Sequence, residues 1–251
     1  MFPDPQPRAL NYAKCPKCSA DSAGREVCPK CGVIFAKYLK TVVGGAPGRA
    51  AQPEEEQESR WKELFFHVPE ETNPTTVYLR AALLASLAAY GVHLAMLDLP
   101  SGEIYGSLMH APLVPIHEFG HLVFMPFGEF MHNLGGTLFQ VLLPLIFGGI
   151  LLVKNRDPFA ASVTLWWSAV AVIDAAPYVY DAYKPEFILL TGRTGDTGGH
   201  DFVDVLGDLG LLNKAQPIGY GVRWFGAGIM AAALAWGAYM LLLQWRRSAS
   251  S

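Results

Sequence analysis

Two groups of residues in this chain have the types and spacing of metal ligands. The first is HEFGH, in which His117 and His121 lie four positions apart and Glu118 follows the first histidine. On a helix, side chains four positions apart project from one face, so both imidazoles can bind one metal ion. Glu118 can then act as a base toward a water molecule on that metal. This spacing predicts a catalytic Zn²⁺ site.

The second group contains all four cysteines of the chain, in two CPKC sequences. Each C-x-x-C pair can form a tight turn that presents two thiolates to one tetrahedral zinc ion. The alternatives are a redox pair or free thiols, but a redox C-x-x-C normally belongs to a larger βαβ domain, for which this segment is too short. Because so few residues cannot bury a core, we expect metal to hold the segment folded. The predicted ligands of this structural Zn²⁺ ion are Cys15, Cys18, Cys28 and Cys31.

The elements that must position these groups are apolar helices. Of the 251 residues, 51% are hydrophobic and only 16% are charged, and the long apolar runs begin near residue 76. A helix needs about 20 mostly apolar residues to span a membrane. Five segments reach or approach that length: 77–98, 104–127, 134–153, 159–181 and 224–245. We therefore predict an all-α integral membrane protein with about five transmembrane helices and a small N-terminal zinc ribbon.

Composition also divides the chain into regions. The stretch 41–59 is rich in Gly, Pro, Ala and Glu, as flexible linkers are. In the stretch after it, Trp61, Leu64, Phe65 and Val68 have helical spacing, which suits a helix on the bilayer surface or one packed on the protein itself. The expected regions are a flexible N-terminus (1–14), a zinc ribbon (15–40), a disordered linker (41–59), an interfacial helix (60–76) and a transmembrane domain (77–251).

Charged residues next to the apolar segments bear on orientation. With five crossings, the N-terminal side carries Arg80, Lys184, Arg193, Lys214 and Arg223, and the other side carries Lys154, Arg156, Arg246 and Arg247. This bias favours a cytoplasmic N-terminus, as reduced thiolates also do. Prolines at 112, 115 and 126 predict that the second segment is broken or re-entrant. The net charge of −3, with no large basic face, excludes nucleic acid as a partner.

Both ligand groups resemble parts of known families. The ribbon is similar to the short zinc ribbons fused to many bacterial membrane proteins, which implies the bacterial inner (plasma) membrane. An HExxH helix in a polytopic apolar chain resembles the site-2 protease group of intramembrane zinc metalloproteases. That resemblance covers about 105–182 and implies that His117 and His121 bind zinc, that Glu118 activates water, and that an aspartate of a later segment is the third ligand.

In that group the aspartate belongs to the motif Asn-x-x-Pro, four residues, Asp-Gly. Here DAAPYVYDA places Asp174 where Asn is expected, brings Asp181 one position closer, and has Ala182 instead of Gly. The resemblance therefore implies Asp181 as the third zinc ligand. Asp174 can orient a ligand or a substrate amide. The alternatives are an interfacial role for Asp181 and a helix–helix hydrogen bond for Asp174.

Two further stretches leave alternatives open. The Gly-rich loop TGDTGGHDF offers His200 as a rival third ligand, with Asp201 behind it, and its GGHDF sequence resembles a less described branch of the same group. In NLGGTLFQ, Gly135 and Gly136 allow close helix packing, or else the segment forms a wall of the site.

These observations predict a membrane-embedded zinc metalloprotease that cleaves a peptide bond of a transmembrane protein substrate within or beside the lipid bilayer. It would hold one catalytic and one structural Zn²⁺ ion. The alternatives are a non-catalytic zinc-binding scaffold or regulator whose ribbon recruits a partner and, with less support, a metal transporter. The presence of Glu118 favours the enzyme, because a scaffold needs only the metal ligands.

Overall fold

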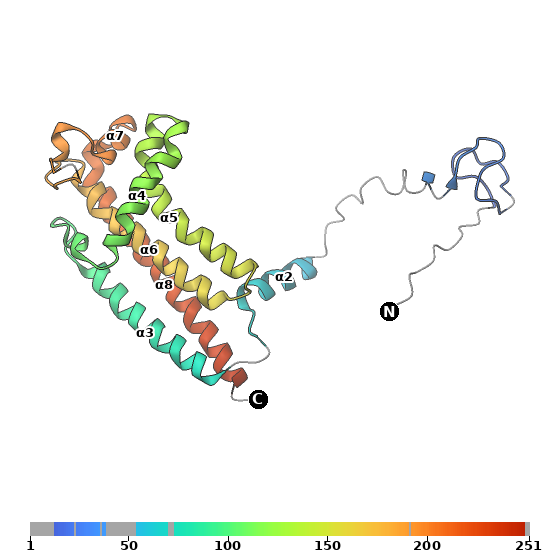
Figure 1. Cartoon of the computed structure of the whole chain (residues 1–251), viewed down its shortest axis with the longest axis horizontal. Helices are drawn as coiled ribbons and strands as arrows, with labels where there is room; N and C mark the ends of the chain where they lie inside the picture. Colours follow the sequence, from blue (N-terminus) through green and yellow to red (C-terminus); the bar gives the residue numbers. More distant parts are fainter. Residues whose placement is uncertain are drawn as a thin grey trace. The chain divides into compact units, whose positions relative to one another are not determined.

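The computed structural model describes residues 13–22, 24–35, 37–38, 54–69, 73–190 and 192–248. The chain divides into two units, Met1–Arg60 and Trp61–Ser251 (Figure 1). Most of the predicted flexible N-terminus and linker lie outside the described residues. A helix nevertheless begins at Glu54, inside the stretch predicted to be a linker.

The first unit contains two turns of the same build, one around each CPKC sequence. The backbone N–H of Cys15 donates to the carbonyl of Ala20 at 2.8 Å, and that of Cys28 donates to the carbonyl of Val33 at 3.0 Å. Phe35 is buried together with Cys15 and Cys28, and these three residues form the small core of the unit. So small a core agrees with a segment that depends on metal for its fold.

The second unit is helical throughout its described part, apart from turns and one isolated β-bridge between Ile188 and Thr194. This confirms the predicted all-α fold class. It contains the end of α2 (Glu54–Phe66), which begins in the first unit, and the α-helices α3 (Pro74–Met96), α4 (His110–Phe124), α5 (Glu129–Val153), α6 (Pro158–Asp181), α7 (Asp201–Asp208) and α8 (Ala215–Ser248). Single 3₁₀ turns are η1 (Glu103–Gly106), η2 (Met125–Phe127), η3 (Gly195–Thr197) and η4 (Leu212–Lys214).

Among the residues that the structure describes, four helical segments rather than five are long and apolar enough to cross a membrane. They are Pro74–Met96, Glu129–Val153, Pro158–Asp181 and Leu212–Ser248. The predicted second span over 104–127 is wrong, because its helical core α4 has only 15 residues. At 1.5 Å per residue, α4 is about 22 Å long and falls short of a hydrocarbon core of about 30 Å. The segment is not one helix, but Pro112 and Pro115 lie inside α4 without interrupting it, and only Pro126 lies in the turn η2 that follows.

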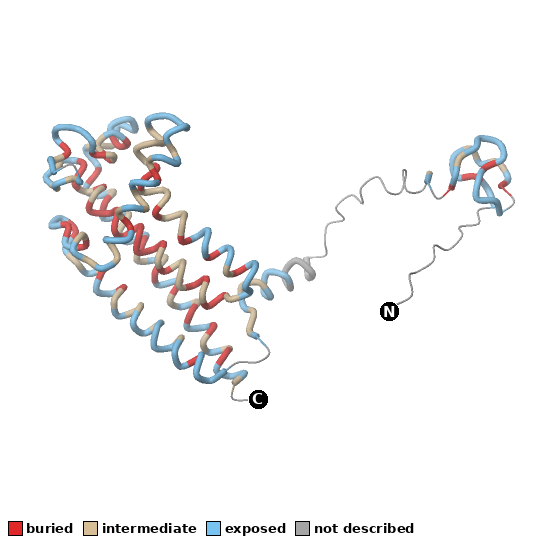
Figure 2. Tube along the Cα trace, viewed as in Figure 1, coloured by how far each residue is buried: buried red, intermediate tan, exposed pale blue. Residues whose placement is uncertain are grey.

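Helix α6 lies at the centre of the bundle, and α3, α5 and α8 surround it (Figures 1 and 2). In the most apolar stretch of 18 residues of each helix, 67% of the residues are buried in α6, compared with 11% in α3. The outer helices expose large apolar side chains such as Leu79, Ile146 and Phe225. An outer surface of this kind suits lipid, and a buried central helix suits a membrane bundle that carries a site in its interior.

Close contact between α6 and α8 depends on glycine. A Cβ atom added to Gly219 would lie 2.9 Å from the carbonyl oxygen of Ala176, and one added to Gly226 would lie 3.1 Å from that of Ala169. Helix backbones approach this closely only where small residues meet them. The tight pairing of α8 with α6 leaves the opposite face of α6 available to α5 and α7.

One end of the bundle gathers the start of the unit, the α5–α6 turn and the C-terminus. Arg156 pairs with Glu63 there, and Arg247 donates to the carbonyl of Val68 at 2.7 Å. Trp236 donates to the carbonyl of Phe65 at 3.0 Å. Helix α2 therefore packs on α8, as one of the two readings predicts, and it ends at Phe66 rather than at residue 76.

The change from five to four spans redistributes the cationic residues. Arg80 pairs with Asp157 at 2.5 Å and so belongs to the end that holds α2. The other cationic residues that flank the spans at this end are Lys154, Arg156, Arg246 and Arg247. Lys184, Arg193 and Lys214 follow α6 or precede α8, and Arg223 donates to the carbonyl of Ala95, near the end of α3. These four lie toward the opposite end of the bundle, so an arrangement with four spans separates them from Arg80, with which five spans would group them.

Candidate metal centres and the pocket

The four thiols of the first unit are arranged as ligands of one metal ion. All four Sγ atoms lie within 4.8 Å of one another. The Sγ atoms of Cys15 and Cys31 are 3.7 Å apart, and so are those of Cys18 and Cys28. Tetrahedral zinc with Zn–S bonds of about 2.3 Å places its sulfur atoms about 3.8 Å apart. The group therefore fits the predicted structural metal site.

In the second unit, α4 presents the two histidines of HEFGH side by side. The rings of His117 and His121 have centroids 4.8 Å apart. His121 Nδ1 lies 2.7 Å from the backbone carbonyl oxygen of His132, and His132 Nδ1 lies 3.0 Å from the carbonyl oxygen of His121. A ring that donates from Nδ1 to a carbonyl keeps Nε2 free to bind metal. The chain thus orients His121 through the start of α5.

Glycines bring α5 against this face of α4. A Cβ atom added to Gly120 would lie 2.4 Å from the carbonyl oxygen of Gly135. One added to Gly136 would lie 2.5 Å from His117 Nε2. Gly136 therefore leaves the space that the His117 ring occupies, and both readings of the NLGGTLFQ stretch hold. Its glycines allow close packing, and Thr137 and Gln140 line the pocket beside the histidines.

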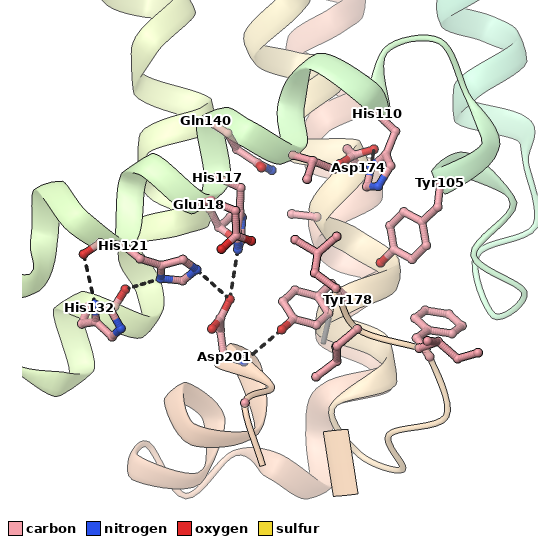
Figure 3. A pocket seen from close by; sticks show the side chains of 18 of the residues that line it. Tyr105, His110, His117, Glu118, His121, His132, Gln140, Asp174, Tyr178 and Asp201 are labelled. Atoms are coloured by element: carbon pink, nitrogen blue, oxygen red, sulfur yellow. Dashed lines mark hydrogen bonds and ion pairs between the residues drawn. The ribbon is translucent and has the colours of Figure 1, made fainter. Parts of the chain in front are cut away.

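A carboxylate from the other side of the bundle completes the group. Asp201 Oδ2, at the first position of α7, lies 3.0 Å from His117 Nε2 and 3.4 Å from His121 Nε2 (Figure 3). The N–H of Asp201 donates to the Tyr178 hydroxyl at 3.1 Å, which anchors this residue to α6. Burial raises the pKa of the Asp201 carboxyl, but hydrogen bonds from His117 and His121 outweigh burial and lower that pKa to about 2. The carboxylate is therefore ionised at neutral pH, as a metal ligand must be.

Asp181, the predicted third ligand, lies elsewhere. Its carboxylate accepts the N–H of Glu186 at 2.9 Å and that of Phe187 at 3.3 Å, and it lies 3.3 Å from His200 Nε2. Neither Asp181 nor His200 lines the pocket, and both are almost fully buried. The structure therefore does not bring Asp181 to the histidine pair. One residue fewer in the motif turns a helical side chain by about 100°, which explains the different direction.

In the Gly-rich loop, the structure places Asp201 rather than His200 beside the histidine pair. His200 caps α7 and stacks on Tyr178, with ring centroids 4.1 Å apart, while its neighbour Asp201 faces the histidines. The available sequence signal was an aspartate at the first turn of a short amphipathic helix. That signal marks many ordinary helix starts, because a carboxylate there is stabilised by the helix dipole. Only the contact with α4 distinguishes Asp201 from Asp204.

These side chains open onto one pocket of about 680 Å³. Glu118 is exposed, lines the pocket and belongs to the His117–His121 group, whose possible ligand atoms lie within 4.8 Å of one another. Two imidazoles, a carboxylate and a neighbouring glutamate are the donor set of a catalytic zinc site with an open position. The residues present therefore fit a metal ion that a substrate can reach.

Comparison of the chain with protein-family models, with curated proteins and with solved structures gives no match. The functional argument therefore depends on the membrane-capable helices and on the two groups that can bind metal.

Proposed function

We propose that the chain is a zinc-dependent metalloprotease of the membrane, in which His117, His121 and Asp201 hold the catalytic ion. The observation that carries this proposal is the position of Asp201, whose Oδ2 approaches both Nε2 atoms within 3.4 Å beside Glu118. Three protein ligands and one open position distinguish a catalytic zinc site from a closed structural one. The four thiolates of the first unit would hold the second, structural zinc ion.

The residues around the proposed ion would then have defined tasks. When bound, zinc supplies a Lewis acid and makes water a stronger acid near neutral pH. Glu118 accepts a proton from the attacking water as the water oxygen bonds to the scissile carbonyl carbon. Glu118 later delivers that proton to the amide nitrogen as the C–N bond breaks. The carbonyl of His132 and the hydroxyl of Tyr178 orient His121 and Asp201 throughout these steps.

The substrate would be a transmembrane segment of another protein. The outer helices expose apolar side chains to lipid, and the pocket is bordered by Val114, Leu122, Ala175 and Ile188. Helical carbonyls are occupied by their own hydrogen bonds, so the substrate must unwind before its scissile bond can enter. The end that holds α2 carries most of the flanking cations, so we place it in the cytoplasm of a bacterial inner membrane.

The test is the substitution Glu118→Gln, which keeps the side chain's size and polarity but removes its ability to accept a proton. Zinc content and helicity should stay at the wild-type level. Cleavage of co-reconstituted single-span substrates should fall by roughly 10²–10⁴-fold, the usual effect of losing a positioned general base. Glu129→Gln is the matched control, because Glu129 is also exposed on a neighbouring helix but does not line the pocket.

Equal cleavage by wild type and Glu118→Gln, with zinc bound in both, would disprove the protease proposal. A scaffold or a metal transporter that uses the same ligands would then be the better account.

A further inference from the structure

The pocket contains a second polar group, which the proposed reaction does not use. His110 Nδ1 lies 3.0 Å from Oδ1 and 3.1 Å from Oδ2 of Asp174. Asp174 is 5% exposed, and the ring of Tyr105 lies on His110 with centroids 4.7 Å apart. Figure 3 shows these three residues on one side of the pocket and His117, Glu118, His121 and Asp201 on the other.

The hydroxyl of Tyr105 is buried, and within the described part of the chain it has no hydrogen-bond partner. Buried polar atoms in native proteins almost always have a partner, so one without a partner beside a pocket points to a missing ligand. Asp174 engages Nδ1 of His110, which leaves Nε2 as the ring nitrogen free for a second partner. The two residues therefore offer two unused polar atoms to whatever enters the pocket.

The spacing along α4 indicates what that ligand is. His110 and His117 are seven positions apart, which is two helical turns on the same face and about 10 Å along the axis. An extended peptide covers that distance in roughly three residues, at about 3.3 Å each. Val114 from α4 and Ala175 from α6 contribute apolar surface to the same pocket. An unwound apolar segment exposes one N–H and one C=O per residue, and each needs a partner away from water.

We propose that Tyr105 and His110, held by Asp174, form a subsite that binds the main chain of an extended apolar peptide about three residues from the bond cleaved. This inference rests on the proposed function. The subsite would bind the strand that results when a substrate helix unwinds, and it would do so through main-chain groups common to every sequence. It would therefore select for an unwound conformation more than for particular side chains.

The experiment compares two zinc-binding probes on the full, zinc-loaded chain in detergent. Acetohydroxamate reaches only the metal, whereas a trileucine hydroxamate also reaches about three residues away. Trileucine probes with the hydroxamate at the C-terminus, or on an N-terminal succinyl group, extend the chain in either direction. The variants are Tyr105→Phe and His110→Gln. The matched controls are Tyr90→Phe and His93→Gln, since the Tyr90 hydroxyl is also buried without a partner in the described region and neither residue lines the pocket.

In the wild type, one trileucine probe should bind more tightly than acetohydroxamate. Tyr105→Phe and His110→Gln should each weaken that probe by about 3- to 10-fold, the usual effect of one hydrogen bond, and leave acetohydroxamate unchanged. Asp174→Asn should produce a similar loss, because it releases the His110 ring. Zinc content should be the same in all variants, and the two controls should bind both probes as the wild type does.

Three outcomes would overturn the subsite. In the first, the trileucine probes bind no better than acetohydroxamate, or equally well to the wild type and to the Tyr105 and His110 variants. In the second, both kinds of probe lose affinity together, which would mean that the substitutions disturb the metal site. In the third, the zinc-loaded wild type binds no acetohydroxamate. The proposed catalytic zinc site then fails, and the subsite fails with it.

Discussion

The two candidate metal centres are built in opposite ways. In the first unit, four ligands of one kind lie within 17 positions of one another, from Cys15 to Cys31, and hydrogen bonds of two similar turns place them. In the bundle, the two histidines come from α4, whereas the carboxylate comes from α7, 84 positions after His117. The first group offers four thiols to one ion, whereas the proposed second site has three protein ligands and a pocket beside them.

The two units differ in whether the metal ion or the packing of the protein determines the fold around the site. The 17 residues from Cys15 to Cys31 cannot bury a core large enough to offset the entropy cost of ordering them, so we expect metal to hold this segment folded. In the bundle, Gly120, Gly136 and Tyr178 position the ligands through helix packing before any ion arrives. In the proposed site the fold would therefore place the ligands in advance and leave one position open for substrate.

Removal of metal should have the largest effect, and that effect should differ between the two units. A strong chelator should unfold the first unit completely. In small structural zinc sites, the apparent free energy of zinc binding, about 10–16 kcal/mol, drives folding. The bundle should keep its helices. Amide exchange of residues 13–38, compared with far-UV circular dichroism of the whole chain, measures both effects. Protected amides around Cys28 after complete removal of zinc would contradict the dependence on metal.

The substitution Asp201→Ala should weaken metal binding in the bundle by more than 100-fold. Loss of a residue that merely orients a ligand costs about 10- to 100-fold, and loss of a ligand should cost more. Asp181→Ala should have the smaller effect, because its carboxylate contacts backbone amides and His200. Competition with a fluorescent zinc chelator gives the affinities. A larger loss for Asp181→Ala would restore Asp181 as the third ligand.

The substitution Gly136→Ala should weaken metal binding in the bundle by about 10- to 100-fold, because the added methyl group displaces the ring of His117. Gly149→Ala in the same helix is the control, since an added Cβ atom there meets nothing within 4 Å. The same competition assay should show no change for Gly149→Ala. If both variants bind zinc as the wild type does, then α5 does not define the position of His117.

The smallest expected effect is in the first unit, at the residue after each CPKC sequence. Ser19 and Gly32 both have positive φ, 57° and 67°. Glycine adopts this conformation without strain, whereas serine does not. Ser19→Gly should therefore strengthen zinc binding by about 1 kcal/mol or less, or two- to five-fold, and Gly32→Ser should weaken it by a similar amount. A zinc titration of the full chain should show that the two substitutions change zinc affinity in opposite directions. Changes in the same direction would contradict this prediction.

Local patterns were enough to predict several features from the sequence. Helical spacing brings His117 and His121 together, and two C-x-x-C pairs close on each other over a short loop. Apolar content predicts helices that can span a membrane. In each of these cases the residues that interact are neighbours in the chain, so the backbone period alone sets their geometry.

Only the tertiary structure decided the number of spans and the partner of the histidines. A hydropathy window sums α4 with the apolar turns around it, whereas the fold ends the helix after 15 residues. Asp181 is buried and Asp201 is partly buried, but both face histidines, and composition cannot distinguish them. Their roles depend on the turn at the end of α6 and on the approach of α7 to α4. Contacts between distant segments depend on packing of the whole bundle, which no local period specifies.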